Sequence, residues 1–226
     1  MHEQVPPMNP PSTDNAGQAL PVVPVNTDPA QDEAWLFTQS LVSSRRNVSS
    51  RRLREPGPSE DQLRALLTLV AAAPDHGQLT PWRFVIVPTL QRHRLADVFA
   101  LALTDRDPAA TAQQVASARE KAHRAPLLLV AIACLGERDP DTPSLERMVS
   151  MGAAIQNLLL GAHAMGFGSG LTSGKAMASD RLRALLGLHE GEQAVCCVNI
   201  GTAGASKAHA RARPDPSVFT STLGGA

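Results

Sequence analysis

An unbroken apolar run, Pro126–Cys134, constrains the fold of this 226-residue chain more than any other segment. A strand whose residues are continuously apolar, rather than alternating with polar ones, is expected to be covered on both faces. A second apolar run, Ala194–Ile200, has the same character. A third strand is predicted over Trp82–Val87, where Pro88 ends it. These runs predict a sheet with a core on each side.

Helices are predicted between and around these strands, over residues 34–42, 63–73, 91–103, 109–123, 144–165 and 179–187. The helix over 144–165 is the longest, and its second half is apolar almost all round, so we expect it to be buried in the core or against a partner. Connections of uneven length argue against a regular doubly wound sheet. The pattern indicates an α+β fold.

The domain organisation follows from composition. Residues 1–31 hold seven prolines and no aromatic residue, so we predict a disordered tail that cannot bury enough apolar area to fold. Residues 32–226 suit one domain. Lysine plus arginine equals aspartate plus glutamate at 21 each, so net charge does not favour nucleic acid or a membrane as partner.

Cysteine usage and the absence of targeting signals predict a cytoplasmic protein. The three cysteines are an odd number in strand-like runs, which argues against a disulfide framework, and no cysteine or histidine spacing predicts a metal site. No apolar stretch reaches the roughly 18 residues that a membrane span requires. The first 44 residues contain no lysine or arginine, whereas a signal or transit peptide would have basic residues near its start.

Three segments carry polar groups suited to a ligand: Arg45–Ser50, the loop and strand entry Ala73–Phe84 (APDHGQLTPWRF), and Met165–Gly174 (MGFGSGLTSG). Loops held between rigid elements commonly bind ligands, although the loop alone also reads as an ordinary helix-to-strand turn. In this order, the three segments resemble motifs of the nitroreductase superfamily, in its YdjA-like branch. The resemblance covers roughly residues 36–220.

The resemblance implies a mixed β-sheet surrounded by helices, in a domain-swapped homodimer with FMN near the interface. It also implies an NAD(P)H oxidoreductase, in which hydride from NADH or NADPH passes through the flavin to an electron-poor acceptor such as a nitroaromatic or a quinone. The cofactor carries this chemistry, so no catalytic side chain is expected. The partners are a second copy of the chain and a small-molecule acceptor.

The resemblance also assigns the cofactor contacts. An arginine pair and an amide would hold the phosphate. The loop after residue 75 would contribute a histidine and a glutamine. In the third segment, glycines would allow close approach of the cofactor, and three further residues align with a family WRS motif. These residues are Arg45, Arg46, Asn47, His76, Gln78, Gly166, Gly168, Leu171, Thr172 and Ser173.

The chain departs from the family pattern at several of these positions. Leu171 and Thr172 replace the family's tryptophan and arginine, and Asn47 replaces a serine. Arg51 and Arg52 could compete for the phosphate, and Lys207, Arg211 or Arg213 could replace the missing cation. A flavin store or sensor without turnover, a dehalogenase or flavin-fragmenting enzyme of the same superfamily, and a flavin-free interaction protein stay open as alternatives.

Overall fold

The computed structural model describes residues 32–136, 141–204 and 212–224, so the predicted tail over 1–31 lies outside the described residues. The chain divides between Gln39 and Ser40, inside the first helix, α1 (Glu33–Ser44). The Asp32 carboxylate accepts a hydrogen bond from the Trp35 amide and so satisfies a free donor at the start of this helix.

The second unit is built on a five-stranded sheet centred on β5 (Glu192–Ala203). β5 pairs with β3 (Leu127–Cys134), and β3 pairs in turn with the edge strand β2 (Trp82–Ile86). β5 also pairs with β4 (Gly168–Thr172) and with the two-residue β1 (Leu53–Arg54). All these ladders are antiparallel. The parallel component within the described chain is a single bridge between Asn47 and Ser169.

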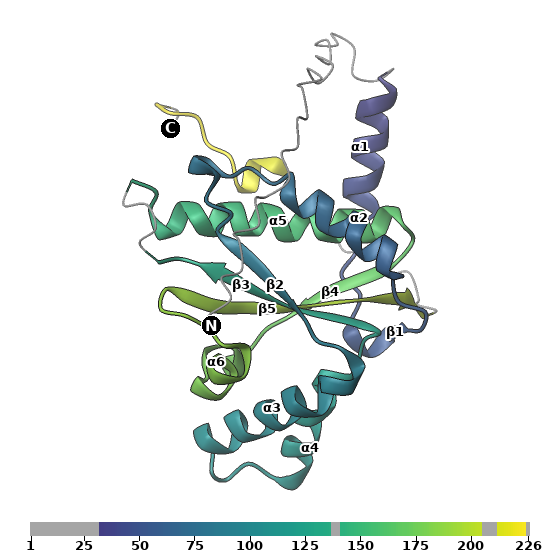
Figure 1. The fold of residues 1–226 in the computed structure, drawn as a ribbon. Coiled ribbons are helices and arrows are strands. Elements are labelled where there is room, and N and C mark those ends of the chain that lie inside the picture. The colour runs from purple at the N-terminus through teal and green to yellow at the C-terminus, as the bar shows by residue number, and fades with distance from the viewer. Residues whose placement is uncertain (1–31, 137–140, 205–211, 225–226) are drawn as a thin grey trace, which may run out of the picture. The chain divides into compact units, whose positions relative to one another are not determined.

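Helices cover both faces of this sheet, as the apolar runs predict (Figure 1). α2 (Glu60–Ala71) and α5 (Ser144–Ala164) lie on one face, and α3 (Arg92–Arg106), α4 (Ala112–Glu120) and α6 (Asp180–Leu186) lie on the other. β3 alternates between the two cores, with Leu129 packed toward α5 and Leu128 toward α3. Residues 128–133 are at most 1% exposed, which confirms a strand buried on both sides.

Helix ends follow local sequence signals. A capping box starts α2, with the Gln62 amide donating to the Ser59 hydroxyl at 3.2 Å and the Ser59 amide donating to the Gln62 side chain at 2.9 Å. Gly187 ends α6 with φ of 58°, a conformation that glycine adopts at little cost. The predicted helices are therefore present, with ends shifted by up to a few residues.

Strand β4 is not predicted from the sequence, because its first residues are Gly168, Ser169 and Gly170. The structure explains both glycines. A Cβ on Gly170 would lie 2.2 Å from the Val48 carbonyl oxygen, and one on Gly168 would lie 3.0 Å from side chains of Leu53 and Ala203. Close packing of the chain on itself therefore requires glycine in this strand.

Helix α5 leaves one apolar stripe uncovered. Its C-terminal half is buried as expected, with Leu158 fully inaccessible, but Leu145 and Val149 in its first turns are 76% and 68% exposed. Gly152 continues this face, and a Cβ added there would meet no atom of the described residues within 4 Å. Exposed apolar residues in a row on one helix indicate a surface for association.

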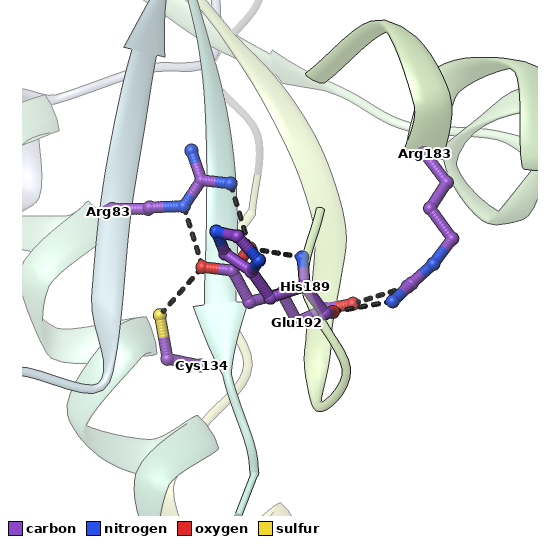
Figure 2. Close-up of polar contacts among 5 residues, drawn as sticks. All are labelled: Arg83, Cys134, Arg183, His189 and Glu192. Atoms are coloured by element: carbon purple, nitrogen blue, oxygen red, sulfur yellow. Dashed lines mark hydrogen bonds and ion pairs between the residues drawn. The ribbon is translucent and has the colours of Figure 1, made fainter. Parts of the chain in front are cut away.

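A partly buried ion pair joins two strands that do not pair with each other, β2 and β5 (Figure 2). Arg83 donates to both oxygens of Glu192, at 2.7 and 2.8 Å, and the Cys134 thiol lies 3.7 Å from the same carboxylate. The Arg83 guanidinium and the His189 amide lower the pKa of Glu192 to about 2. Arg183 bonds the carbonyls of His189 and Glu192, which fixes the start of β5.

Candidate active site

The segment 45–48 runs alongside β4. The Val48 amide donates to the Ser169 carbonyl at 2.8 Å, and the Leu171 amide donates to the Asn47 side-chain oxygen at 3.3 Å. Two of the three sequence segments predicted to bind the cofactor, 45–50 and 165–174, are thus brought together within one chain. Arg45 is half-buried there and Arg46 is exposed.

The C-terminal segment adds a third cation to this place. The Arg213 guanidinium donates to the Arg45 carbonyl oxygen at 3.0 Å, although the two residues are 168 positions apart. Of the three basic residues considered as replacements for the missing family arginine, Arg213 therefore lies beside the motif, and Lys207 and Arg211 lie outside the described residues. Arg45, Arg46 and Arg213 are called the arginine cluster below.

A pocket of about 750 Å³ lies on the face of the sheet that α3 and α4 cover. Its volume falls within the range of small-molecule and cofactor sites. Leu171, Thr172 and Ser173 line it together with Ser50, so the altered family motif does face a cavity. Thr172 is held by the Asn199 amide, which donates to its hydroxyl at 3.0 Å.

Among the residues that the structure describes, four cations and no carboxylate line the pocket. These cations are Arg106 of α3, Lys121 and Arg124 beside α4, and Lys175 after β4. The side chain of Arg124 is only 12% exposed, and it pairs with Glu120 at 3.3 Å. Its Nε is nevertheless buried without a hydrogen-bond partner in the described part of the chain, an arrangement that is costly unless a ligand completes it.

These four cations lie outside the motifs that the sequence analysis assigns to the cofactor. One signal was available, because Gln113, Ser117 and Lys121 stand four residues apart and all three line the pocket. Such spacing places side chains on one face of a helix. Nothing in the sequence alone shows that this polar face turns toward β4, since α4 and β4 are separated by about fifty residues of chain, including β3 and α5.

His76 and Gln78 lie elsewhere. His76 Nδ1 is 2.6 Å from a Glu146 carboxylate oxygen at the start of α5, whereas Ser44, next to the arginine cluster, bonds His163 near the end of the same helix. Glu146 and His163 are 17 residues apart, or about 25 Å at 1.5 Å per residue. The predicted loop and the arginine cluster therefore lie near opposite ends of α5 within one chain.

The loop itself is held in an unusual conformation. Gln78 and Thr80 have positive φ angles of 52° and 46°, which are unfavourable for residues other than glycine. The Asp75 carboxylate stabilises this backbone by accepting hydrogen bonds from the Leu79 amide at 3.1 Å and the Thr80 amide at 2.7 Å. The exposed Gln78 side chain is thereby presented at the surface.

The two predicted glycines do not line the pocket. Gly166 has φ of 84° and forms the turn after α5, and Gly168 is buried against Leu53 and Ala203. Their assigned close approach to a cofactor stays a prediction. Within the described ranges, no group of three histidine, cysteine or acidic residues could hold a metal ion. No described helix is both long and apolar enough to cross a membrane.

Comparisons with known proteins place this architecture. Residues 42–202 match the Nitroreductase family. The chain is 30% identical over 174 residues to a Haemophilus influenzae protein named "Putative NAD(P)H nitroreductase", covering 77% of this chain and 92% of that protein. It is 31% identical over 182 residues to Escherichia coli K12 YdjA, which has the same descriptive name, covering 79% and 95%.

Solved structures share the fold. A nitroreductase-like protein from Bacillus cereus superposes with a TM-score of 0.70 at 20% identity, over 90% of this chain and all of that one. The FMN-dependent nitroreductase NfnB from Mycobacterium smegmatis, solved with NADPH, gives 0.59 at 20% identity, over 76% of this chain and 89% of that one. The match to the family covers well over half of the sequence, and the fold brings two of the three motifs together; this chain belongs to the nitroreductase family.

Proposed function

We propose that the protein is an FMN-dependent oxidoreductase that uses NADH or NADPH to reduce an electron-poor small molecule. The observation that carries this proposal is the pocket lined by four cations and by Leu171–Ser173, since β4 joins these residues to the segment that carries Arg45 and Arg46. FMN requires a cationic site for its phosphate at one end. At the other end it requires room for a flat ring that is negatively charged when reduced. The residues present fit both requirements.

The arginine cluster would hold the phosphate, because guanidinium groups bind phosphate oxygens in pairs of charge-assisted hydrogen bonds. Phe99, Leu103 and Met177 supply apolar walls for a ring in the pocket, and Lys121 and Arg124 supply positive charge at its edge. When bound, FMN accepts hydride from reduced nicotinamide and passes it to an acceptor. The side chains position the ring and stabilise its negative charge.

We propose that the active unit is a homodimer packed through the exposed stripe of α5. A two-fold axis across this stripe pairs the helix with its own copy in antiparallel orientation, since a two-fold interface uses the same patch on both subunits. With the axis near Val149, the start of one α5 then lies beside the middle of the other, roughly 16 Å along the helix from His163. The partner's His76 and the partner's Gln78 would thus approach the arginine cluster, about 25 Å away within one chain by the helix rise.

The C-terminal segment supports an exchange of chain ends between the subunits. Val218 and Phe219 are 76% and 67% exposed. A groove of about 310 Å³ lies along α2 and the edge strand β2, with Leu67, Trp82 and Phe84 in its lining. An exposed apolar arm and an apolar groove at a strand edge are complementary. We propose that the arm of each subunit occupies the groove of the other.

We also propose that the protein resides in the cytoplasm. No disulfide joins the three cysteines, and burial raises the pKa of Cys196 to about 11 and of Cys197 to about 12. Cys196 and Cys197 thus act as small apolar residues rather than reactive thiols. Cysteines that form no disulfide fit a reducing environment.

The test of the proposed function is a visible absorption spectrum of the purified protein, before and after anaerobic addition of NADPH or NADH. We expect a flavin spectrum that a nicotinamide bleaches, and recovery of the colour when a nitroaromatic or quinone is added. A flavin spectrum that neither nucleotide bleaches would favour a store or sensor. A colourless protein that does not take up added FMN would contradict the proposal.

A further inference from the structure

We propose that Arg106 and Lys175 form an anion subsite at the mouth of the pocket, which binds a phosphate or carboxylate group of the reductant or of the acceptor. This inference rests on the proposed function and adds the chemical class of the substrate. It concerns two residues that neither the family motifs nor the sequence analysis assign.

The two cations come from different elements that meet at the pocket. Arg106 is the last residue of α3, and Lys175 is the first residue of the short helix Lys175–Ala178 that follows β4. Both line the pocket, and both are exposed to solvent, in contrast to Arg124 with 12% of its side chain exposed. Arg106 and Lys175 are therefore accessible to a ligand that enters the pocket from solvent.

Neighbouring carboxylates are already engaged. Asp105 pairs with Arg181, with an Nη2 to Oδ1 distance of 3.0 Å, and Asp107 accepts a hydrogen bond from the Ala109 amide at 3.2 Å. Among the described residues, no hydrogen bond or ion pair involves the side chain of Arg106 or Lys175. The partial negative charge at the C-terminal end of α3 explains a cation at Arg106, the last residue of that helix. It does not explain Lys175, which lines the pocket from another element.

A count of charges shows that these two cations exceed what FMN needs. The flavin phosphate has the arginine cluster, and the negative edge of a reduced ring has Lys121 and Arg124. Four cations, with no carboxylate among the described lining residues of a cavity of about 750 Å³, create a positive potential that attracts anions. Arg106 and Lys175 are thus available to a second anion. A guanidinium and an ammonium group bind either phosphate or carboxylate oxygens.

The test compares the Arg106→Gln/Lys175→Gln double variant with the wild-type flavoprotein, using ligand pairs that differ by one anionic group. These pairs are NADPH with NADH, and 4-nitrobenzoate with nitrobenzene. The double variant Arg64→Gln/Arg94→Gln removes two exposed cations outside the pocket and serves as the control. KM values are measured for turnover, and Kd values for 2′,5′-ADP and 4-nitrobenzoate are measured calorimetrically without turnover.

In one pair, we expect the KM and Kd of the ligand with the additional anionic group to rise about tenfold, the equivalent of about 1.4 kcal/mol. The KM of the counterpart without that group should change less than about twofold. A selective effect on NADPH and 2′,5′-ADP would identify the nucleotide phosphate as the anion, and one on 4-nitrobenzoate would identify an acceptor carboxylate. Equal values for both pairs in variant and wild type would overturn the subsite. Failure of the proposed function is separate, because it appears as wild-type protein without bleachable flavin.

Discussion

Single side chains decide the charge of this site. The arginine cluster is assembled from residues at both ends of the domain, and the contact that joins them is a bond from the Arg213 side chain to the Arg45 backbone. Because this bond uses one donor of Arg213, the other donors of its guanidinium group are left for a ligand. The cluster is therefore built by the fold and not by the Arg45–Arg46 pair alone.

Replacing Arg45 with alanine should weaken FMN binding. Loss of a hydrogen bond to a charged group costs about 1.5–3 kcal/mol, so Kd should rise about 10- to 100-fold. Quenching of flavin fluorescence during titration measures this affinity, and circular dichroism checks that the fold is kept. Arg64→Ala, at an exposed position of α2, is the control. An unchanged Kd for Arg45→Ala would remove this residue from the phosphate site.

At the scale of elements, β4 and the segment 45–48 act as one unit. Their contact depends on the missing side chain of Gly170, which allows the Val48 carbonyl to approach. The strand contacts the segment that carries Arg45 and Arg46, and it continues into Leu171–Ser173, which line the pocket. A change in β4 should therefore reach both ends of the bound cofactor.

Gly170→Ala tests this coupling. The new methyl group would lie 2.2 Å from the Val48 oxygen, so the segment 45–48 must move away. Overpacking of this kind costs about 1–3 kcal/mol of stability. We expect a folded protein with at least roughly tenfold weaker FMN binding. In Gly136→Ala the nearest atom would be 3.5 Å away, so this control should bind normally. Equal flavin content in both variants would contradict the coupling.

The Arg83–Glu192 pair links the start of β2 to the start of β5. Its contribution to the free energy of unfolding should depend on pH. The pKa of Glu192 is lowered from 4.5 to about 2 in the folded state, so its stabilising effect is complete above pH 4.5 and is lost as pH falls toward 2. Glu192→Gln should lower the free energy of unfolding near pH 7 by about 1.5–3 kcal/mol, the usual cost for a hydrogen bond to a charged group.

Urea titrations of wild type and Glu192→Gln between about pH 2.5 and 7 measure this difference, which should shrink below pH 4.5. Glu190→Gln, at an exposed neighbouring position, should remain close to wild type throughout. A difference between wild type and Glu192→Gln that stays constant with pH would show that the ion pair is not responsible.

The sequence predicts the elements that local patterns define. The run Pro126–Cys134 predicts β3, Ser59 with Gln62 predicts the start of α2, and Gly187 predicts the end of α6. It does not predict β4, because glycine disfavours strands and only the neighbouring segment explains its use here. The His76–Glu146 contact spans 70 residues and the pocket cations come from separate segments, so no local pattern joins them.

For the whole molecule, the exposed stripe of α5 would set the assembly. Leu145 and Val149 leave most of their apolar side chains exposed on one face of α5, where a second subunit would cover them. His76 and the arginine cluster lie far apart along the same helix. A second subunit bound to the exposed stripe of α5 would bring its own His76 closer to the arginine cluster of the first.

Val149→Lys should convert a dimer into a monomer. A charge placed at the centre of an apolar interface must be buried without a partner, which costs several kcal/mol per subunit. Sedimentation velocity at micromolar protein should show the change in mass. Leu90→Lys alters a residue that is 84% exposed and away from α5, so this variant should stay dimeric. A wild-type protein that sediments as a monomer would argue against the interface.

The distance between the two halves of the proposed site along α5 would make cofactor affinity a function of protein concentration. If each flavin is held by groups from both chains, free FMN and subunit association are thermodynamically linked, and each strengthens the other. Dilution should then release yellow cofactor at protein concentrations where the subunits separate, and excess FMN should shift that point to lower concentration. The holoenzyme would assemble only where the cell supplies both the chain and the vitamin-derived cofactor in sufficient amount.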